Sequence, residues 1–534
     1  MGPRAGAWAA RGGAIAAGLG AAFAHPPFGI LPGLLGYAGL LWLCDHAAPE
    51  RPIRSAFFRG WLTGVAYFFV STWWVAEAFY VDAKDQAWMA PFAVALLAMG
   101  LALFWGAAAA FYRALAPPGV RRLLVFAGAL TACEWLRGHL FTGFPWDLPG
   151  ETWRAGSALS QTASVVGAYG LTWLTLAIAA APGLGWRGRD AKLALAAAVA
   201  ALVGLYGFGA WRLAHAPGAP GPGAPLVRIV QPDTAEAASD APGGFARVLQ
   251  RNLDLTRLPA TRSPDVVIWS EQGLPAALGD YLAPGTPSLG AIESALRPGQ
   301  TLITGGYRTA PAPPGAFAPD GVLYFNSLVA LQRTASGLTL SALYDKHRLA
   351  PFGEYLPLGR YLAPLGVQQL VHVGQGFTPG PAPRPIAPPG VPAFQPLICY
   401  ESLFPGFTRE GARLAGRRPA WIVNISDDAW FGVTSGPWQH LNLASYRAIE
   451  EGLPLVRATP TGVSAVIDAY GRPMPGKLLG EGAYGVIDAV LPTSIPSTVF
   501  DRFGAALLAA MLLVSLSAMF QRGNPTLRRN GDVM

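Results

Sequence analysis

The chain has 534 residues, of which 52 % are hydrophobic and only 13 % are charged. Charged residues make up about a quarter of a soluble globular domain, so this composition excludes an ordinary soluble enzyme and indicates a protein embedded in a membrane. The net charge of +8 does not indicate binding to nucleic acid, because many of the cationic residues lie in short loops between apolar segments.

Apolar segments that could cross a bilayer lie at both ends of the chain. A span needs about 20 predominantly apolar residues. Seven such segments precede residue 215, at 7–24, 27–45, 57–79, 88–112, 122–140, 160–183 and 193–213, and an eighth covers 501–520. The first segment also has features of a signal peptide, with Arg4 and Arg11 ahead of a short apolar run. We expect a span there, because Gly-rich and Ala-rich spans follow directly.

Loop charges predict the orientation of these segments, since short cytoplasmic loops are enriched in Lys and Arg. The loops after the second, fourth and sixth segments carry such residues: Arg51, Arg54 and Arg59; Arg113, Arg121 and Arg122; Arg187, Arg189 and Lys192. The C-terminal tail carries Arg522, Arg528 and Arg529. We therefore expect seven transmembrane helices in residues 1–214, an extracytoplasmic domain in 215–498, and an eighth transmembrane helix with a basic cytoplasmic tail in 499–534.

Residues 215–498 have the composition of a globular α/β domain. The Pro/Gly-rich run AHAPGAPGPGAPL separates this region from the preceding span. Short apolar runs such as DVVIWSE, TLITGGY, PLICYE and WIVNISD alternate with helix-like stretches. Strands this apolar are usually buried on both faces, so we expect layered sheets covered by helices.

Three chemically active side chains end three of the predicted strands. Glu271 ends DVVIWSE, Lys346 follows LYD, and Cys399 ends PLIC. Reactive groups in open α/β folds gather beyond the carboxyl ends of the strands, so the three side chains could share a pocket. A carboxylate can take the proton of a thiol, while an ammonium and the backbone N–H of Tyr400 can stabilise an oxyanion. The set predicts acyl transfer through a thioester.

Each of these residues also has an ordinary structural explanation. Cys399 could be a small buried hydrophobic residue, Glu271 could lie beside a helix N-cap, and Lys346 could be a solvated loop charge. Cys44 and Cys133 lie in predicted spans, so Cys399 has no partner for an internal disulfide.

The histidine pattern does not indicate a metal site. His347, His372 and His440 are scattered and form neither an HxxxH nor an HExxH pattern. A papain-like Cys-His pair is also not favoured, because the family signature that surrounds such a nucleophile is absent here.

Four longer motifs, in this order along the chain, carry a family resemblance. They are WSEQGLP at 269–275, YDKHRLAPFGEYLP at 344–357, ICYES at 398–402 and NISDDAWFGVTSGPWQHL at 424–441. Together they resemble the nitrilase superfamily, and more closely its membrane-anchored branch, the apolipoprotein N-acyltransferases of bacterial inner membranes. The resemblance covers nearly the whole chain and implies a multi-span helical membrane domain plus an α/β nitrilase-like domain, an α-β-β-α sandwich.

The resemblance also assigns roles to the motif residues. It implies that Cys399 is the nucleophile, Glu271 the general base and Lys346 the cation that stabilises the oxyanion. Glu354 matches a second glutamate that supports this triad and its loop. Further supporting or substrate-binding matches are Tyr400, Glu401, Trp430 and Phe431, whose ordinary roles would be packing and loop folding.

The activity implied by the resemblance joins two lipid substrates. Cys399 would take an acyl chain from the sn-1 position of a phospholipid, typically phosphatidylethanolamine, and pass it to the N-terminal amine of an S-diacylglyceryl-cysteine apolipoprotein. This would complete lipoprotein maturation, with no metal ion or cofactor. The implied location is the bacterial inner membrane, with a multi-pass anchor and the catalytic domain on the periplasmic side.

Two other functions remain open on the sequence. A membrane-anchored amidase of the nitrilase type would use the same triad to hydrolyse small amides, and a transporter or scaffold would use the domain only for binding. The apolar stretch at 358–370 is predicted to be an arm that dips into the membrane interface and controls access. One departure from the family pattern is QPDTAEAASDAPGG at 231–244, which lacks a tryptophan often found there.

Overall fold

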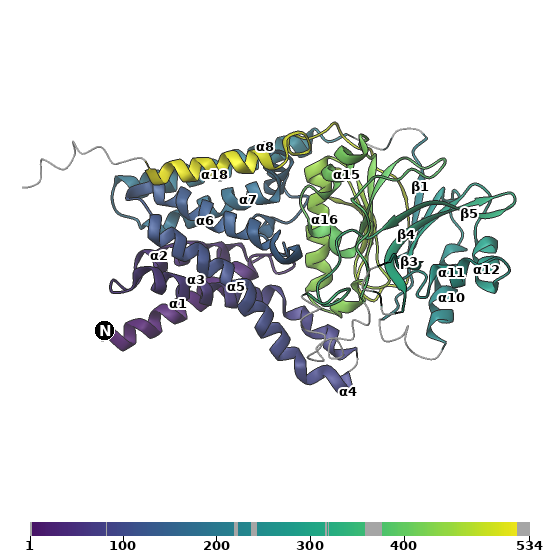
Figure 1. The fold of residues 1–534 in the computed structure, drawn as a ribbon. Helices are drawn as coiled ribbons and strands as arrows, with labels where there is room; N and C mark the ends of the chain where they lie inside the picture. Colours follow the sequence, from purple (N-terminus) through teal and green to yellow (C-terminus); the bar gives the residue numbers. More distant parts are fainter. Residues whose placement is uncertain are drawn as a thin grey trace, which may run out of the picture.

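The computed structural model describes residues 3–520, apart from 82, 218–219, 221–222, 236–242, 315–317, 319 and 358–375. The described chain forms a bundle of helices and a sandwich of two sheets, which lie side by side (Figure 1). The predicted arm at 358–370 and the basic tail beyond residue 520 lie outside the described residues.

Each of the eight predicted apolar segments contains a helix. These helices are α1 (Pro3–Phe23), α2 (Leu35–Asp45), α3 (Pro52–Ser71), α5 (Ala90–Leu115), α6 (Arg122–Arg137), α7 (Ala163–Ala180), α8 (Arg189–Ala214) and α18 (Ala505–Phe520). The C-terminal α18 returns to the bundle and packs along α6 and α7 (Figure 1). A helix near the end of the chain therefore packs against two helices that precede the sandwich in sequence.

Three helical segments among the described residues are long and apolar enough to cross a membrane. They are Ala83–Leu115, Leu159–Leu184 and Arg189–Ala214. The apolar helices at Leu31–Asp45 and Ala505–Phe520 are shorter. These segments fit a membrane protein, while the full set of seven spans plus one stays a prediction.

The third apolar segment differs from its predicted form. Its α-helix ends at Ser71, and Trp73–Tyr80 form a 3-10 helix, η2. The indole N–H of Trp73 donates to Ser435 Oγ at 3.0 Å, and the ring of Trp74 contacts that of Phe431 edge to face. The apolar residues of η2 thus contact the sandwich, which explains why the α-helix ends earlier than hydropathy predicted.

The sandwich consists of a six-stranded and a five-stranded sheet. The first has the order β11-β1-β2-β3-β4-β5, and the second β10-β9-β8-β7-β6. The strands are β1 (Leu226–Gln231), β2 (Val266–Ile268), β3 (Thr301–Pro311), β4 (Val322–Thr334), β5 (Gly337–Asp345), β6 (Phe394–Ile398), β7 (Trp421–Ile425), β8 (Leu455–Ala458), β9 (Ser464–Ile467), β10 (Pro473–Leu479) and β11 (Gly485–Val490). Strands β1, β2 and β3 are parallel, as are β6, β7 and β8.

Four layers of secondary structure follow from the burial pattern. Side chains of both sheets, such as Ile268 and Val423, share one buried core between the sheets. Helices α10 (Gly244–Thr256) and α12 (Pro287–Ala295) pack on the outer face of the first sheet. Helices α15 (Phe407–Ala415) and α16 (Gly436–Glu451) pack on the outer face of the second. The predicted α-β-β-α sandwich is confirmed.

Helix α16 lies between the sandwich and the helical bundle (Figure 1). Its polar side chains bond the long connection between α6 and α7. Gln439 donates to Asp147 at 3.0 Å and Asn442 to the Glu151 carbonyl at 3.0 Å. Arg447 also pairs with Glu151, at 3.4 Å. These buried contacts hold the two parts of the chain together.

Candidate active site

The three predicted catalytic residues lie at strand ends, as expected. Glu271 follows β2 and Lys346 follows β5, both in the first sheet, whereas Cys399 follows β6 in the second. Lys346 Nζ is 3.2 Å from Glu271 Oε1 and 2.9 Å from Glu354 Oε2. The structure thus brings the lysine and both glutamates together.

Cys399 has an unusual backbone conformation. Its φ of 47° lies in the left-handed region, which is unfavourable for a residue with a Cβ and frequent at functional sites. The residue begins a short 3-10 helix, η10 (Cys399–Leu403), and stays partly exposed. The conformation turns the chain sharply at the end of the strand, as a nucleophile placed at a strand-to-helix turn requires.

Neighbouring charges shift the pKa of the Cys399 thiol in opposite directions. Burial raises the pKa of Cys399 and the Glu271 carboxylate raises it further, while the Lys346 ammonium lowers it. The resting group is therefore a neutral thiol, and its proton must pass to a base during attack. Glu271 is the carboxylate whose charge acts on the thiol, so it is the candidate for that base.

Lys346 stays charged although it is buried. Burial alone would lower the pKa of its ammonium, but the Glu271 and Glu354 carboxylates outweigh this effect and raise the pKa well above its ordinary value. Asn326 donates to Glu271 Oε1 at 2.7 Å and to Glu354 Oε1 at 2.6 Å. The amide of Asn326 therefore fixes the separation of the two carboxylates. This residue, in the middle of β4, was missed by the sequence analysis.

Glu401 connects the lysine loop to the cysteine turn. One of its oxygens accepts from the Tyr344 hydroxyl at 2.8 Å and from the backbone N–H of His347 at 2.7 Å. The other accepts from the backbone N–H of Ile398 at 2.8 Å. This predicted supporting residue thus holds the segments on either side of the triad at a fixed distance.

The other supporting residues lie toward the helical bundle. The Tyr400 hydroxyl donates to the Gly143 carbonyl at 2.5 Å, in the connection between α6 and α7. Phe431 is buried against Trp74 and Trp146, whereas Trp430 is 41 % exposed. Tyr400 and Phe431 therefore join the site to the bundle.

The connection between α6 and α7 was missed as part of the site. Thr142 Oγ1 is 2.6 Å from the Tyr355 hydroxyl, and the Thr142 carbonyl accepts from Arg348 at 3.4 Å. Phe141 and Thr142 both have positive φ values, 54° and 75°. The connection lies against the loop that carries Lys346 and Glu354. Its sequence signal is the pair of acids, Asp147 and Glu151, which follow the fifth predicted span.

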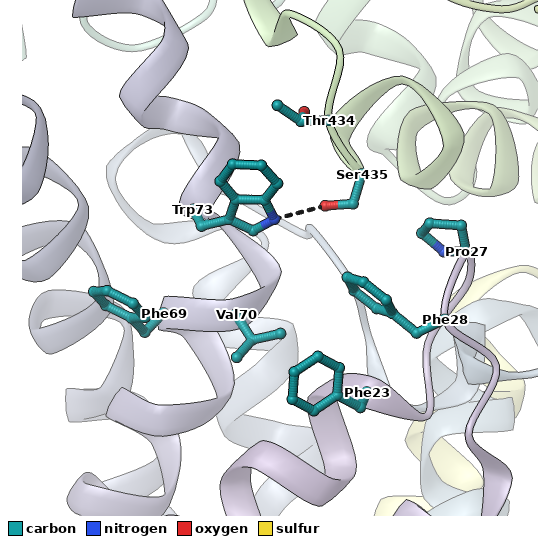
Figure 2. A pocket seen from close by; sticks show the side chains of 8 residues that line it. All are labelled: Phe23, Pro27, Phe28, Phe69, Val70, Trp73, Thr434 and Ser435. Carbon is teal, nitrogen blue, oxygen red and sulfur yellow. Dashed lines mark hydrogen bonds between the residues drawn. The ribbon is translucent and has the colours of Figure 1, made fainter.

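An apolar groove of about 500 Å³ lies between α1, α3 and the sandwich, away from the predicted catalytic residues. Figure 2 shows the rings of Phe23, Phe28, Phe69 and Trp73 around it, and the Trp73–Ser435 hydrogen bond. The lining residues are Phe23, Pro27, Phe28, Phe69, Val70, Trp73, Thr434 and Ser435. In the described part of the chain, no three His, Cys, Asp or Glu side chains are grouped to hold a metal ion.

Two family models match the chain, one for each part. "Apolipoprotein N-acyltransferase N-terminal domain" covers residues 17–181 and "Carbon-nitrogen hydrolase" covers residues 226–494. Among solved structures, a cysteine-to-serine mutant of the Nesterenkonia AN1 amidase, from the nitrilase superfamily, is 18 % identical with a TM-score of 0.35. The match covers 54 % of this chain and 98 % of that one.

Curated relatives match the chain over nearly its whole length. The apolipoprotein N-acyltransferase of Caulobacter vibrioides is 54 % identical over 95 % of this chain and 94 % of the relative. The proteins of the same name from Bradyrhizobium diazoefficiens and Brucella melitensis are each 38 % identical, over 96 % and 90 % of this chain and 95 % and 90 % of the relatives.

Proposed function

Because the chain belongs to the apolipoprotein N-acyltransferase family, we propose that it acylates apolipoproteins through a thioester on Cys399. The family membership makes the protein a lipoprotein N-acyltransferase. The roles of individual residues and the identity of the acyl donor are the proposal. The observation that carries it is the position of Lys346, which is paired with Glu271 and Glu354 in a loop that Glu401 bonds to the Cys399 turn.

The first half-reaction forms the acyl-enzyme. Cys399 Sγ attacks the sn-1 ester carbonyl of a phospholipid while Glu271 takes the thiol proton. The Lys346 ammonium and the backbone N–H of Tyr400 stabilise the oxyanion. The ester C–O bond then breaks, and the lysophospholipid leaves as an alcohol with the proton returned by Glu271. The buried ammonium favours this step because its charge is poorly screened there.

The second half-reaction transfers the acyl group to the lipoprotein. The free N-terminal amine of the diacylated apolipoprotein attacks the thioester carbonyl, and Glu271 accepts a proton from the amine. The C–S bond breaks, the amide forms, and Cys399 recovers its proton. Excluding water from the site favours attack of the amine on the thioester over hydrolysis of the thioester.

The location of the site fits lipid substrates. We place the protein in the bacterial inner membrane with the catalytic part on the periplasmic side, on the basis of the arginine-rich loops and the apolar helices. Phosphatidylethanolamine is the donor that we propose to test first. Both substrates carry acyl chains, so an anchored enzyme meets them within the same leaflet.

The mass of the intact protein tests the proposal. Purified protein is incubated with phosphatidylethanolamine in the absence of an acceptor, alongside Cys399→Ala. We expect an acyl-sized adduct on the parent protein, none on the variant, and its discharge by a diacylated lipopeptide as an amide. Discharge to water at the same rate, with no lipopeptide product, would instead identify an amidase-like hydrolase. The absence of an adduct on the folded parent protein would refute the thioester.

A further inference from the structure

A buried histidine contacts the backbone of Cys399 from the side of α16. His440 Nε2 is 3.3 Å from the Cys399 carbonyl oxygen and 2.9 Å from Ser402 Oγ. The Ser402 hydroxyl donates to the same carbonyl at 2.8 Å. Two polar side chains thus converge on the peptide group that follows the predicted nucleophile.

This carbonyl lies at the point where the chain is strained. The φ of Cys399 is 47°, a conformation that a residue with a Cβ adopts only when its surroundings impose it. Hydrogen bonds to the carbonyl oxygen fix the orientation of the peptide plane between Cys399 and Tyr400. The same plane carries the backbone N–H of Tyr400, which is assigned above to the oxyanion.

The far side of the imidazole is anchored by buried charges. His440 Nδ1 is 3.1 Å from Asp428 Oδ1 and 3.0 Å from Arg457 Nη2. Arg457 Nη2 also donates to both Asp428 oxygens at 2.7 Å, and Ser426 donates to Asp428 at 2.8 Å. Asp428, His440 and Arg457 are all buried, so these hydrogen bonds are shielded from water and restrict the movement of the imidazole.

The two ring nitrogens have different partners. Both atoms facing Nε2, Ser402 Oγ and the Cys399 carbonyl oxygen, can accept a hydrogen bond. Nδ1 faces a donor, Arg457, and an acceptor, Asp428 Oδ1, so it has a partner whether or not it carries the proton. Burial and the Arg457 charge lower the pKa of His440, so the ring is neutral. The tautomer with its proton on Nε2 donates to the Cys399 carbonyl and accepts from Arg457, and this is the form that the inference uses.

We propose that His440 is a positioning residue that holds the Cys399 carbonyl, and with it the thiol and the Tyr400 N–H, in the geometry for acyl-enzyme formation. The inference rests on the proposed role of Cys399 as nucleophile. His440 acts through the backbone, so it contributes to the rate of the chemical step and leaves lipid binding unchanged.

Four variants distinguish a positioning role of His440 from a general effect on the stability of the fold. His440→Leu fills a similar volume without polar atoms, whereas His440→Gln keeps an N–H donor near the position of Nε2. Ser402→Ala removes the second donor to the same carbonyl. Ser445→Ala is the control, because its buried hydroxyl bonds the Leu441 carbonyl within α16. The readouts are the rate of acyl-enzyme formation against phosphatidylethanolamine concentration and the rate of Cys399 alkylation by iodoacetamide, followed by peptide mass.

We expect His440→Leu to lower the maximal rate of acyl-enzyme formation by ~10²-fold, the effect of a displacement of about 1 Å, with an unchanged half-saturating lipid concentration. His440→Gln should recover most of that rate, Ser402→Ala should show a partial loss, and Ser445→Ala should match the parent. Equal rates for His440→Leu and the parent, or for His440→Leu and His440→Gln, would overturn the inference.

The alkylation assay keeps the two proposals separate. If the parent forms no acyl-enzyme, the proposed function fails, but a changed alkylation rate in His440→Leu and its recovery in His440→Gln still support the positioning role. An unchanged alkylation rate overturns that role. If His440→Leu does not fold, Ser402→Ala tests the same carbonyl: a lowered alkylation rate supports the inference, and an unchanged one contradicts it.

Discussion

Lys346 Nζ lies 3.2 Å from Glu271 Oε1, and both side chains are almost completely buried. A buried ion pair of this kind does not by itself stabilise a fold, because desolvation of the two charges offsets their attraction. The pair also places the base beside the charge that would stabilise an oxyanion. Glu354 adds a second carboxylate, so Lys346 keeps a partner when Glu271 takes a proton.

The two glutamates should therefore differ in their contribution to activity. Glu354→Gln leaves Lys346 paired with Glu271, and we expect a loss of roughly 10- to 100-fold, of the order of one misplaced charged hydrogen bond. Glu271→Gln removes the base and should abolish detectable adduct formation. Intact-mass kinetics with phosphatidylethanolamine measure both. Equal losses in the two variants would contradict the assignment of Glu271 as the base.

The pH dependence of thiol reactivity provides an independent test. Burial raises the pKa of Cys399, and the Glu271 charge adds to this effect. Alkylation of the parent by iodoacetamide should therefore still rise with pH above the ordinary thiol value of about 8.5, where a free cysteine levels off. Glu271→Gln removes the neighbouring negative charge, so its profile should shift to lower pH although acyl transfer is lost. A shift to higher pH would show that Glu271 does not act on the thiol as proposed.

Gly305 in β3 approaches the backbone of Glu271 closely. A Cβ at position 305 would lie 2.1 Å from the Glu271 carbonyl oxygen. Gly305→Ala should displace Glu271 and lower the rate of acyl-enzyme formation by ~10²-fold, as a displacement of about 1 Å does. Gly290→Ala is the matched control, since a Cβ there meets no atom within 4 Å. If Gly305→Ala and Gly290→Ala both form the acyl-enzyme at the parental rate, the position of Glu271 does not limit the reaction, and its proposed role as the base is contradicted.

Asp428 should make stability depend on pH in acid. Burial alone would raise the pKa of its carboxyl, but Arg457 and His440 outweigh burial and lower it to about 2. Because the folded pKa is below the unfolded value of about 3.9, the contribution is present above about pH 4 and is lost as the pH falls through about 2. The free energy of unfolding gained is ~2 kcal/mol.

Asp428→Asn removes this titration and leaves Arg457 without its carboxylate. Its deficit in unfolding free energy relative to the parent should shrink by ~2 kcal/mol between about pH 5 and about pH 2. Chemical denaturation of both proteins in detergent gives the two curves. A deficit that stays constant over this range would contradict the lowered pKa of Asp428.

The sequence analysis found the residues whose signal is local. Glu271, Lys346 and Cys399 are conspicuous because each polar side chain ends an apolar strand. Asn326 was missed because it lies in the middle of a strand, where a single amide has no periodic signal. His440 was considered only as a metal ligand, because α16 has polar residues on both faces and its sequence does not indicate a contact with the cysteine turn.

Other features depend on contacts that no single segment encodes. The 3-10 helix Trp73–Tyr80 has the composition of a membrane span, and only its contacts with Ser435 and Phe431 reveal its place in the fold. Composition predicted layered sheets, but their pairing into a sandwich came from the resemblance of the motifs. Long-range pairing of this kind joins strands that are distant in sequence, so local propensity does not specify it.

Helix α16 also bears on whether the α/β part can exist alone. His440 on this helix contacts the cysteine turn, while Gln439, Asn442 and Arg447 are buried and bond residues of the connection between α6 and α7. A fragment that begins at residue 223 would expose these three side chains and take Glu151 away from Arg447. We expect such a fragment to be poorly folded, because the helix that shapes the cysteine turn needs both neighbours. The ranges 17–181 and 226–494 match separate sequence families, but buried contacts of α16 join them in this chain.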